Sequence, residues 1–393
     1  MSLATADRLA FERVKACRPQ WSGFCLVRDL VGSGRILLHA GPPFESREHI
    51  PAPVMNSLCT GAVWEGWASD EAQARRMILN HEIELRPAQD NAIVVPLAGV
   101  VSPSMSLLVV QDGNRPEACR FSVLNEGMVH CTRLGRRDPL LPAHLSWLNE
   151  DLAEWLKERL QQPLALLPLM RAALADGDDC HGRTLAGSAL IHQQLTAMAS
   201  EQVPADIDAF LQNSPAFALN LWMAACSLML AAAEGVSGAS LVTRAGGNGV
   251  TFGIQLATAP GRWITMPAPP IHGLVEPAHT GRTALGALGD SAVVDFAGLG
   301  GQVLNTAHAS RQALAPVLPA DALTRPAQVL AGPLPELDDR PAVTSARCVT
   351  TNGGGPLVLL GMIEETGEAG RIGGGVADVP VTLFEQALRE VMK

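Results

Sequence analysis

The chain has 393 residues, more than one ordinary hydrophobic core accommodates, so two or three domains are expected. Hydrophobic residues make up 47% of it and charged residues only 17%, a balance that excludes a disordered chain and indicates a well-buried globular protein. The net charge of −10 argues against a nucleic-acid partner, because binding to phosphates needs a basic face. A few arginines can still hold a small anion locally.

The first region, residues 1–140, alternates helices and strands. Ala4–Cys17 interleaves charged and apolar residues as an amphipathic helix does, and it does not resemble a signal peptide. Further on, Ser69 is expected to cap a helix that begins with Asp70–Ala74. The alternation predicts a mixed α/β region, with strands at Arg35–Ala40, Ala92–Val101 and Ser106–Val110 and a hairpin turn at Asp112–Arg115.

The middle region, residues 141–236, reads as helix only. Apolar residues recur at helical spacing, and Pro163 interrupts the pattern. The most apolar run, Phe217–Ala233, approaches the length of a membrane span but contains Asn220 and Ser227 and lacks basic flanks. We expect a buried core or subunit-interface helix there and no membrane contact. The predicted helices are a run from Pro142 that Pro163 breaks, its continuation to Ala175, Leu185–Ala199, Asp206–Gln212 and Pro215–Glu234.

The last region, residues 237–393, returns to strands and is rich in glycine. Its predicted strands are Ser240–Arg244, Thr251–Ala257, Ala292–Phe296 and Leu357–Met362, and the proline-rich stretch Pro316–Pro341 is expected to cross the surface. The predicted fold class is therefore α+β and multidomain, with two mixed α/β regions and a central all-helical domain.

The eight cysteines form no C-x-x-C pair and follow no regular spacing. Such usage is typical of reduced thiols, so it predicts a cytoplasmic protein and neither a disulfide frame nor a zinc ribbon.

Reactive groups are densest at Asp176–Thr184, which places three carboxylates, a thiol, an imidazole and a guanidinium between two predicted helices. These groups can provide a general base, a nucleophile and an anion clamp. The alternative is a polar turn, with Gly177 as C-cap and Asp178 or Asp179 as the next N-cap. Cys180 and His181 lack a partner at metal-ligand spacing, so we expect neither a metal nor a cofactor.

Two glycine turns are candidate anion sites. Gly298–Gly301 follows a predicted strand and precedes a predicted helix from Gln302, a junction that exposes backbone N–H groups. It lacks the G-x-G-x-x-G spacing of a dinucleotide site, and small-anion binding and a structural turn remain open. Gly370–Gly375 carries Arg371 as an added cation, with a tight turn before the last helix as the alternative.

Several short sequence segments, taken together and in their order along the chain, resemble those of the YlbE/AllG-like family. The central Gly177-Asp178 with His181-x-Arg183 and the closing Gly370-x-Ile372-Gly373-x-Gly375 fit its pattern. The resemblance covers nearly the whole chain, and the other matching phrases are Leu37–Pro43, Glu65–Ala68, Asp70–Ala74, Asp112–Arg115, Leu124–Gly127, Gly289–Ala292 and Phe384–Leu388.

The resemblance implies a subunit of oxamate carbamoyltransferase, acting beside an FdrA-like subunit and a third small subunit. It implies a reaction in which oxalurate and phosphate give oxamate and carbamoyl phosphate. It also implies that the enzyme works together with a carbamate kinase in the breakdown of allantoin. It also implies a multidomain α+β fold with a small helical domain in the middle. The chain departs from the family pattern at Glu364-Glu365, where a His-Lys pair is expected, at Asp179-Cys180 in place of Glu-Phe, and at Gly182; it is also somewhat short.

Carbamoyl transfer needs a carboxylate clamp, a phosphate cradle and a proton acceptor. We assign His181 as acid/base with Asp179 orienting it, and Arg183 as an anion partner. Candidate substrate-binding residues are His39, Asn114, Arg115, Asn125, Glu126, Arg244, Asn248, Asp290, Gly298, Gly300, Gly301, Arg371 and Gly373.

Two other functions remain open. One is a non-catalytic assembly subunit for an FdrA-like partner, which the replacement of a basic pair by Glu364-Glu365 favours. The other is a hydrolase of ureido acids. The apolar helix at 216–233 favours a homodimer.

Overall fold

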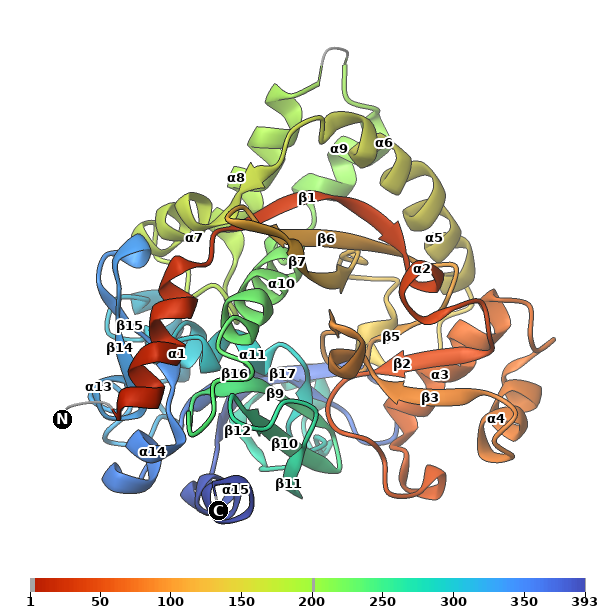
Figure 1. Cartoon of the computed structure of the whole chain (residues 1–393). Helices are drawn as coiled ribbons and strands as arrows, with labels where there is room; N and C mark the ends of the chain where they lie inside the picture. The colour runs from red at the N-terminus through yellow and green to blue at the C-terminus, as the bar shows by residue number, and fades with distance from the viewer. Residues whose placement is uncertain (1–3, 200–201, 393) are drawn as a thin grey trace.

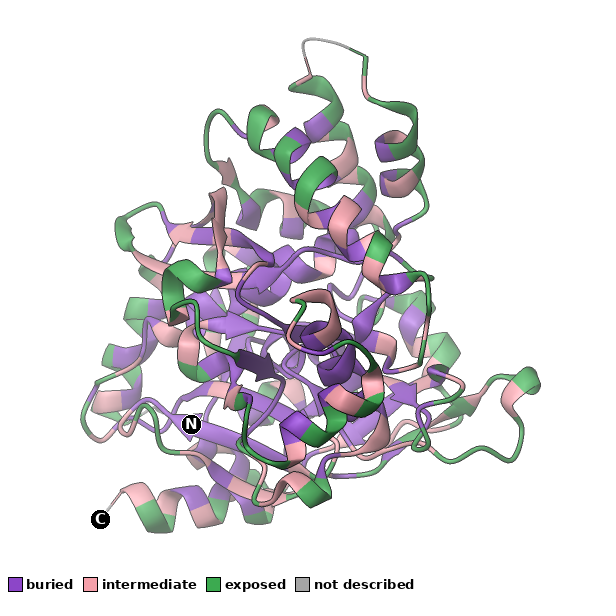
Figure 2. Cartoon of the chain, turned by 90° about the vertical axis from the view of Figure 1, so that its right-hand side faces the viewer, coloured by how far each residue is buried: buried purple, intermediate pink, exposed green. Residues whose placement is uncertain are grey.

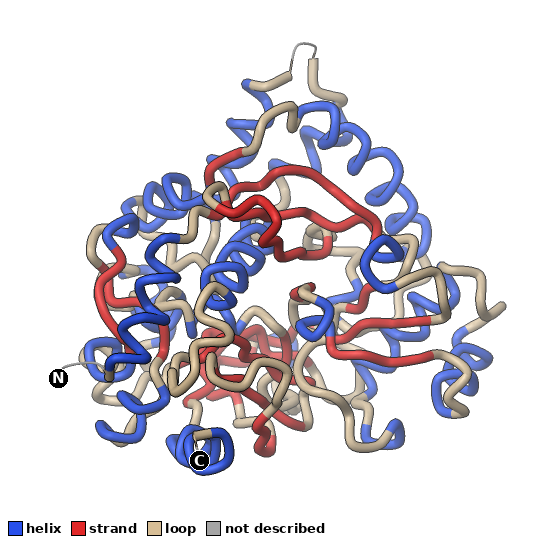
Figure 3. Tube along the Cα trace, viewed as in Figure 1, coloured by secondary structure: helices blue, strands red, loops and turns tan. Residues whose placement is uncertain are grey.

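The computed structural model describes residues 4–199 and 202–392, and it interleaves helices and sheets along the chain (Figure 1). Figure 3 shows the strands as separate groups with helices and loops between them. The mixed α and β composition predicted from the sequence is confirmed.

The N-terminal region contributes a sheet in the order β4-β7-β6-β1-β8. The predicted first helix is confirmed as α1 (Thr5–Ala16), and the predicted hairpin turn at Asp112–Arg115 joins two antiparallel strands. The fifth strand, from the region predicted to be all helix, was missed because it has only two residues. The strands are β1 (Pro19–Leu26), β4 (Ile93–Val94), β6 (Ser106–Asp112), β7 (Arg115–Val123) and β8 (Leu164–Ala165).

A second, smaller sheet has the order β3-β2-β5 and lies beside helices α3 and α4. The predicted strand Ala92–Val101 is divided into β4 and β5, because Pro96 and the left-handed Leu97 (φ 47°) interrupt it. Asp70, not Ser69, is the N-cap of α4: its carboxylate accepts from Gln73 N at 2.7 Å. The elements are β2 (Ile36–His39), β3 (Glu84–Pro87), β5 (Val100–Val101), α2 (Val27–Val31), α3 (Ala52–Trp64) and α4 (Glu71–Leu79).

The predicted helical region is largely confirmed. Its last helix, α10, is buried almost throughout and contacts β6 and β7 on one side and β9 and α11 on another (Figure 1). No single described helix is long and apolar enough to cross a membrane; α9 and α10 meet that test only as a pair, bent by 68°. The helices are α5 (Leu141–Trp147), the π-helical turn Leu148–Leu152, α6 (Ala153–Arg159), α7 (Leu166–Ala175), α8 (Leu185–Ala197), α9 (Ala205–Gln212) and α10 (Phe217–Ala231).

The C-terminal region forms a sheet β11-β10-β9-β13, a sheet β12-β17-β16 and a hairpin β14-β15. Most predicted strands are confirmed within a few residues. The elements are β9 (Val242–Asn248), β10 (Thr251–Leu256), β11 (Ile264–Pro267), β12 (Ile271–Val275), β13 (Leu288–Gly289), α11 (Ala292–Phe296), α12 (His308–Leu314), α13 (Pro326–Val329), β14 (Leu330–Leu334), η7 (Pro335–Leu337), β15 (Arg340–Thr344), α14 (Ala346–Asn352), β16 (Leu357–Ile363), β17 (Arg371–Asp378) and α15 (Val381–Val391).

Three predictions for this region are wrong. Ala292–Phe296 is a helix, not a strand; all five side chains are buried, so their pattern carries no periodicity to separate the two. The glycines of Gly370–Gly375 do not form a tight turn, because Gly373 to Gly375 lie within β17. A Cβ on Gly373 would lie 2.2 Å from Leu274 O, so glycine there allows close strand packing. Pro316–Pro341 contains α13, β14 and η7 and is more than a surface crossing.

One large hydrophobic cluster runs through all three predicted regions, from Ala10 through Leu221 to Ala387. Figure 2 shows buried residues throughout the body of the molecule and exposed ones on the helices at its top. The domain boundaries near 140 and 236 stay a prediction.

Candidate functional site

The Asp176–Thr184 turn connects α7 to α8 and is shaped by two caps. Gly177 adopts the left-handed conformation (φ 91°), and Asp178 N donates to Ala173 O at 3.0 Å, which closes a Schellman motif. The Asp178 carboxylate then accepts from Gly187 N, in the first turn of α8, at 2.8 Å. The predicted glycine cap is therefore present. The predicted N-cap is wrong in position, because Thr184 is the N-cap residue of α8 and Asp178 reaches its first turn from the loop, and both contacts fix the loop that carries His181.

His181 is buried and forms a short hydrogen bond with a carboxylate from another region. Its Nδ1 lies 2.5 Å from Asp295 Oδ2, on α11. The other oxygen of Asp295 accepts from Gly301 N at 2.8 Å and Leu359 N at 3.1 Å. Three donors thus converge on one fully buried carboxylate. Burial raises the pKa of Asp295, and these hydrogen bonds together with the charge of His181 oppose that rise.

This pairing determines the proton chemistry of His181. Burial alone would lower the pKa of its imidazole, but the charge and hydrogen bond of Asp295 outweigh burial and raise that pKa above its usual value. The Nε2 atom has no hydrogen-bond partner among the described residues and is not among their enclosed unpaired atoms. It is therefore the nitrogen that can exchange a proton with a substrate.

Asp179 does not orient the imidazole ring as predicted from the sequence. Its Oδ1 accepts from the backbone N of His181 at 2.7 Å and of Arg183 at 3.1 Å, and its Oδ2 accepts from Ser310 Oγ at 2.5 Å. Asp179 shapes the turn, whereas Asp295 holds the ring.

Sequence reasoning missed Asp295 and Ser310 at this site. Asp295 lies within a five-residue run that is otherwise apolar, and a lone acid in such a run implies a buried carboxylate with a partner. That signal was available in the sequence. The hydroxyl of Ser310 had no comparable signal.

The glycine turn Gly298–Gly301 binds the carboxylate of Asp295 and not a substrate anion. Gly301 N donates to Asp295 Oδ1, Gly300 N to Asp179 O at 2.8 Å, and Gly298 N to Asp295 O at 3.0 Å. A Cβ on Gly300 would lie 2.2 Å from Asp295 Oδ1, so glycine is required there. The N–H groups of these three glycines are all occupied, and no open cradle for a substrate anion is formed at the turn.

The predicted anion-binding arginines do not converge. Each lies beside an acid of its own, so their charges are largely compensated. Arg183 lies 3.9 Å from Asp178, Arg115 3.1 Å from Asp112, Arg244 2.9 Å from Asp90 and 3.2 Å from Glu234, and Arg371 3.2 Å from Glu276.

Three other predicted residues, His39, Asn248 and Asp290, meet in a second buried cluster on the N-terminal side of α11. Asp290 Oδ1 accepts from Gly41 N at 2.8 Å and Gln89 Nε2 at 2.7 Å, and its Oδ2 accepts from Val95 N at 3.0 Å. Asn248 Nδ2 donates to Pro42 O at 3.0 Å, and His39 Nδ1 lies 2.9 Å from Ala40 O.

Burial shifts both titratable groups of this cluster. It raises the pKa of Asp290 to about 7, against the opposing effect of its hydrogen bonds. It lowers the pKa of His39 to about 4. Near neutral pH, His39 is therefore an uncharged core residue.

The remaining predicted polar residues serve local structure. Asn125 Nδ2 donates to Asn220 Oδ1 at 2.8 Å, and the buried Glu126 accepts from Thr132 N at 2.9 Å. Burial raises the pKa of Glu126. Asn114 Nδ2 donates to Ala16 O at 2.7 Å. None of the three lies at the His181 turn.

Glu364, one of the two departures from a basic pair, closes its own loop. Its carboxylate accepts from the backbone N of Thr366 at 3.1 Å and of Glu368 at 3.0 Å.

Within residues 4–199 and 202–392, no three His, Cys, Asp or Glu side chains gather in a way that could hold a metal ion.

The sequence of this chain is similar to those of a known protein family. The family model described as oxamate carbamoyltransferase subunit AllG matches residues 83–291. The oxamate carbamoyltransferase subunit AllG of Escherichia coli (strain K12) is 30% identical over 415 residues, covering 98% of this chain and 97% of that protein. The chain belongs to the AllG family.

The predicted resemblance is thus confirmed. The uncharacterized protein YahG of the same organism is 27% identical over 405 residues. The alignment covers 98% of this chain and 85% of YahG. A crystal structure of a conserved protein of unknown function from Enterococcus faecalis V583 superposes with a TM-score of 0.89 at 27% identity, over 98% of this chain and 96% of that one. The match to the family model, residues 83–291, includes His181 and Asp290 and ends before Asp295.

Proposed function

We propose that this AllG-family chain is a subunit of an oxamate carbamoyltransferase-like enzyme, which transfers a carbamoyl group between oxalurate, or a related ureido acid, and phosphate. The observation that carries the proposal is the buried His181–Asp295 pair with an unpaired Nε2, in a chain that matches the AllG subunit over nearly its full length. Such a pair suits a reaction in which one proton must move.

In the proposed reaction, a phosphate oxygen attacks the carbonyl carbon of the ureido group. A C–O bond forms, and the C–N bond to the oxamate nitrogen breaks. His181 Nε2 accepts the proton of hydrogen phosphate and donates it to the departing nitrogen, so the imidazole ends as it began. Asp295 stabilises the imidazolium while it carries the proton.

Among the described residues, the anion-binding groups predicted from the sequence do not form an open site beside His181. The glycine N–H groups of the turn are occupied, and Arg183 lies near Asp178. This favours a site that is completed by other subunits, and we propose an FdrA-like subunit and a third small subunit as the partners. We also propose that the chain forms a homodimer and acts in the cytoplasm.

Non-catalytic assembly is the alternative that a specific observation favours. Only 6% of the His181 surface is exposed, and the turn around it is closed by internal hydrogen bonds. In that case the chain would stabilise its partner, and His181 and Asp295 would stabilise the chain.

The proposal is tested by assaying the complex of this chain with its FdrA-like and small partners. Carbamoyl phosphate is supplied with oxamate, and phosphate release is measured with and without the acceptor. Oxamate-dependent release supports a transferase. Ammonia release from oxalurate without phosphate would indicate a ureido-acid hydrolase instead, and activity of the partners without this chain would indicate an assembly subunit.

A further inference from the structure

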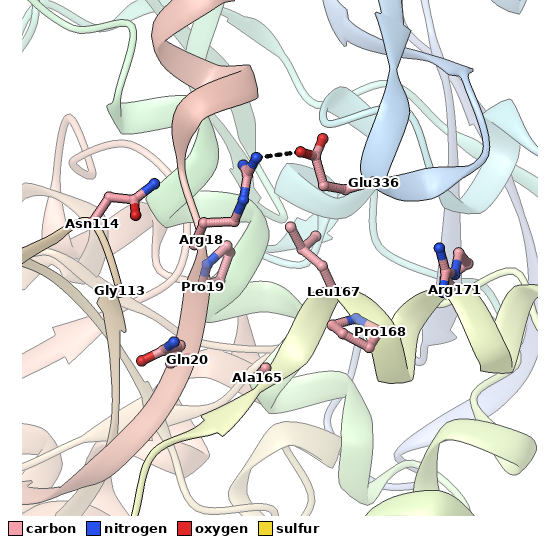
Figure 4. A pocket seen from close by; sticks show the side chains of 10 residues that line it. All are labelled: Arg18, Pro19, Gln20, Gly113, Asn114, Ala165, Leu167, Pro168, Arg171 and Glu336. Carbon is pink, nitrogen blue, oxygen red and sulfur yellow. Dashed lines mark hydrogen bonds and ion pairs between the residues drawn. The ribbon is translucent and has the colours of Figure 1, made fainter.

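A cavity of about 330 Å³ lies away from His181, at the other end of α7 (Figure 4). Arg18 and Gln20 line it from the start of β1, Asn114 from the β6–β7 turn, Arg171 from α7 and Glu336 from η7. No residue of the Asp176–Thr184 turn lines the cavity, and the nearest lining residue on α7, Arg171, lies about 8 Å along the helix from Asp176. It is therefore distinct from the candidate site.

The cavity is locally cationic in an acidic chain. It is lined by two guanidinium groups and one carboxylate, which leaves one positive charge, whereas the chain has a net charge of −10. Arg18 is held in place: its Nη1 donates to Lys15 O at 2.6 Å and Cys17 O at 2.9 Å, and its Nη2 contacts Glu336. A guanidinium has five N–H donors, so two of those on Arg18 remain for a ligand.

Arg171 provides the second cation. It forms no hydrogen bond or ion pair with any residue that the structure describes, and it is exposed on the face of α7 that lines the cavity. Its planar fork matches the two oxygens of a carboxylate or phosphate. One unpaired and one fixed arginine thus line the same cavity, which indicates a site for a negative ligand.

Polar groups on the opposite wall can complete the recognition. The Gln20 amide makes no hydrogen bond within the described chain and lies beside Gly113, where a Cβ would be 2.6 Å from its Nε2. Asn114 uses its Nδ2 to bond Ala16 O and keeps its amide oxygen. These amides can bond the uncharged end of a small molecule.

We infer that this cavity binds a small oxyanion, a carboxylate or phosphate, between Arg171 and Arg18, with the Gln20 amide as a further donor. Glu336 opposes the ligand's charge and therefore limits its affinity. The volume suits one small metabolite. The inference does not depend on the proposed carbamoyl transfer.

The test is isothermal titration of the full chain with inorganic phosphate, oxamate and uncharged acetamide. Arg171→Gln should weaken anion binding about tenfold, the effect of losing one charge-assisted contact. Glu336→Gln should strengthen it several-fold, because it removes the opposing charge. Arg262→Gln is the matched control, since it removes an exposed arginine that pairs with Glu390 elsewhere. The relative affinities for phosphate and oxamate show which oxyanion the cavity prefers.

Equal weakening by Arg171→Gln and Arg262→Gln, or no effect of Glu336→Gln, would overturn the inference. So would anion binding that is lost in His181→Gln, because it would then belong to the other site. Binding retained in an inactive His181→Gln variant supports this cavity separately from the catalytic proposal.

Discussion

His181 illustrates how a single hydrogen bond decides what a residue can do. Asp295 occupies its Nδ1, so in the neutral ring the proton lies on that side and Nε2 is free to accept one. The same carboxylate raises the pKa of the imidazole. The ring can therefore act as base and then as acid without turning.

Replacing Asp295 with asparagine should separate these effects. The neutral amide introduced by Asp295→Asn would not stabilise an imidazolium, so the pKa of His181 should fall and carbamoyl transfer should slow by roughly 10²–10⁴-fold. A pH–rate profile of the complex checks this, and its limb for His181 should move to lower pH. An unchanged profile in a folded variant would contradict the assignment.

His39 and Asp290 should give opposite pH dependences of stability. With the pKa of Asp290 raised from 3.8 to about 7, the native chain keeps a proton that the unfolded chain releases, so rising pH lowers the free energy of unfolding across that range. With the pKa of His39 lowered from 6.5 to about 4, the unfolded chain binds the extra proton, so rising pH raises the free energy of unfolding.

The two dependences largely cancel in the natural chain between pH 4 and 6.5. In Asp290→Asn the slope of unfolding free energy against pH should become more positive, and in His39→Gln more negative, by up to about 1.4 kcal/mol per pH unit. Urea unfolding from about pH 4.5 to about pH 7 checks this, with the exposed Asp151→Asn as control. Parallel curves for all variants would contradict the two shifts.

At the scale of elements, the Asp176–Thr184 turn shows what could and could not be predicted. Gly177 had a clear capping signal and ends α7 as predicted, whereas Asp178 caps the first turn of α8 from the loop and Thr184 is the N-cap residue. The strand predicted at Ala292–Phe296 is a helix because a short, wholly buried run has no readable periodicity. The partner of His181 lies on that helix, 114 residues away, and local patterns cannot reveal such a pairing.

The cap of α8 gives a prediction for this element. Asp178→Ala removes the acceptor of the Gly187 N–H and should lower the free energy of unfolding by about 1–2 kcal/mol. Chemical denaturation checks the value. Asp176→Ala, an exposed neighbour on the same turn, is the control and should change it by less than about 0.5 kcal/mol. Equal losses in both variants would mean that the cap contributes nothing specific.

At the scale of the whole molecule, α10 connects the sheets. It is buried between β6 and β7 on one side and β9 and α11 on the other, and its side chains belong to a cluster that spans all three predicted regions. The helix itself was evident from its apolar sequence. Its central place was not, because apolar residues surround nearly the whole helix and their pattern identifies no neighbour.

This arrangement predicts cooperative unfolding. Leu221→Ala in α10 should lower the free energy of unfolding by about 2–5 kcal/mol and shift one common transition, whether followed by circular dichroism or tryptophan fluorescence. The exposed Leu9→Ala is the control. Two separate transitions, only one of them shifted, would indicate that the three regions fold independently.

The most direct test of the central claim is the rate of carbamoyl phosphate formation from oxalurate by the complex carrying His181→Gln, compared with His192→Gln. His192 also pairs with an aspartate, Asp208 at 2.8 Å, but on the surface of α8, so it matches the substitution without touching the site. We predict a loss of roughly 10²–10⁴-fold for His181→Gln and an unchanged rate for His192→Gln. Equal activity of both variants in intact complexes would contradict the catalytic role of His181.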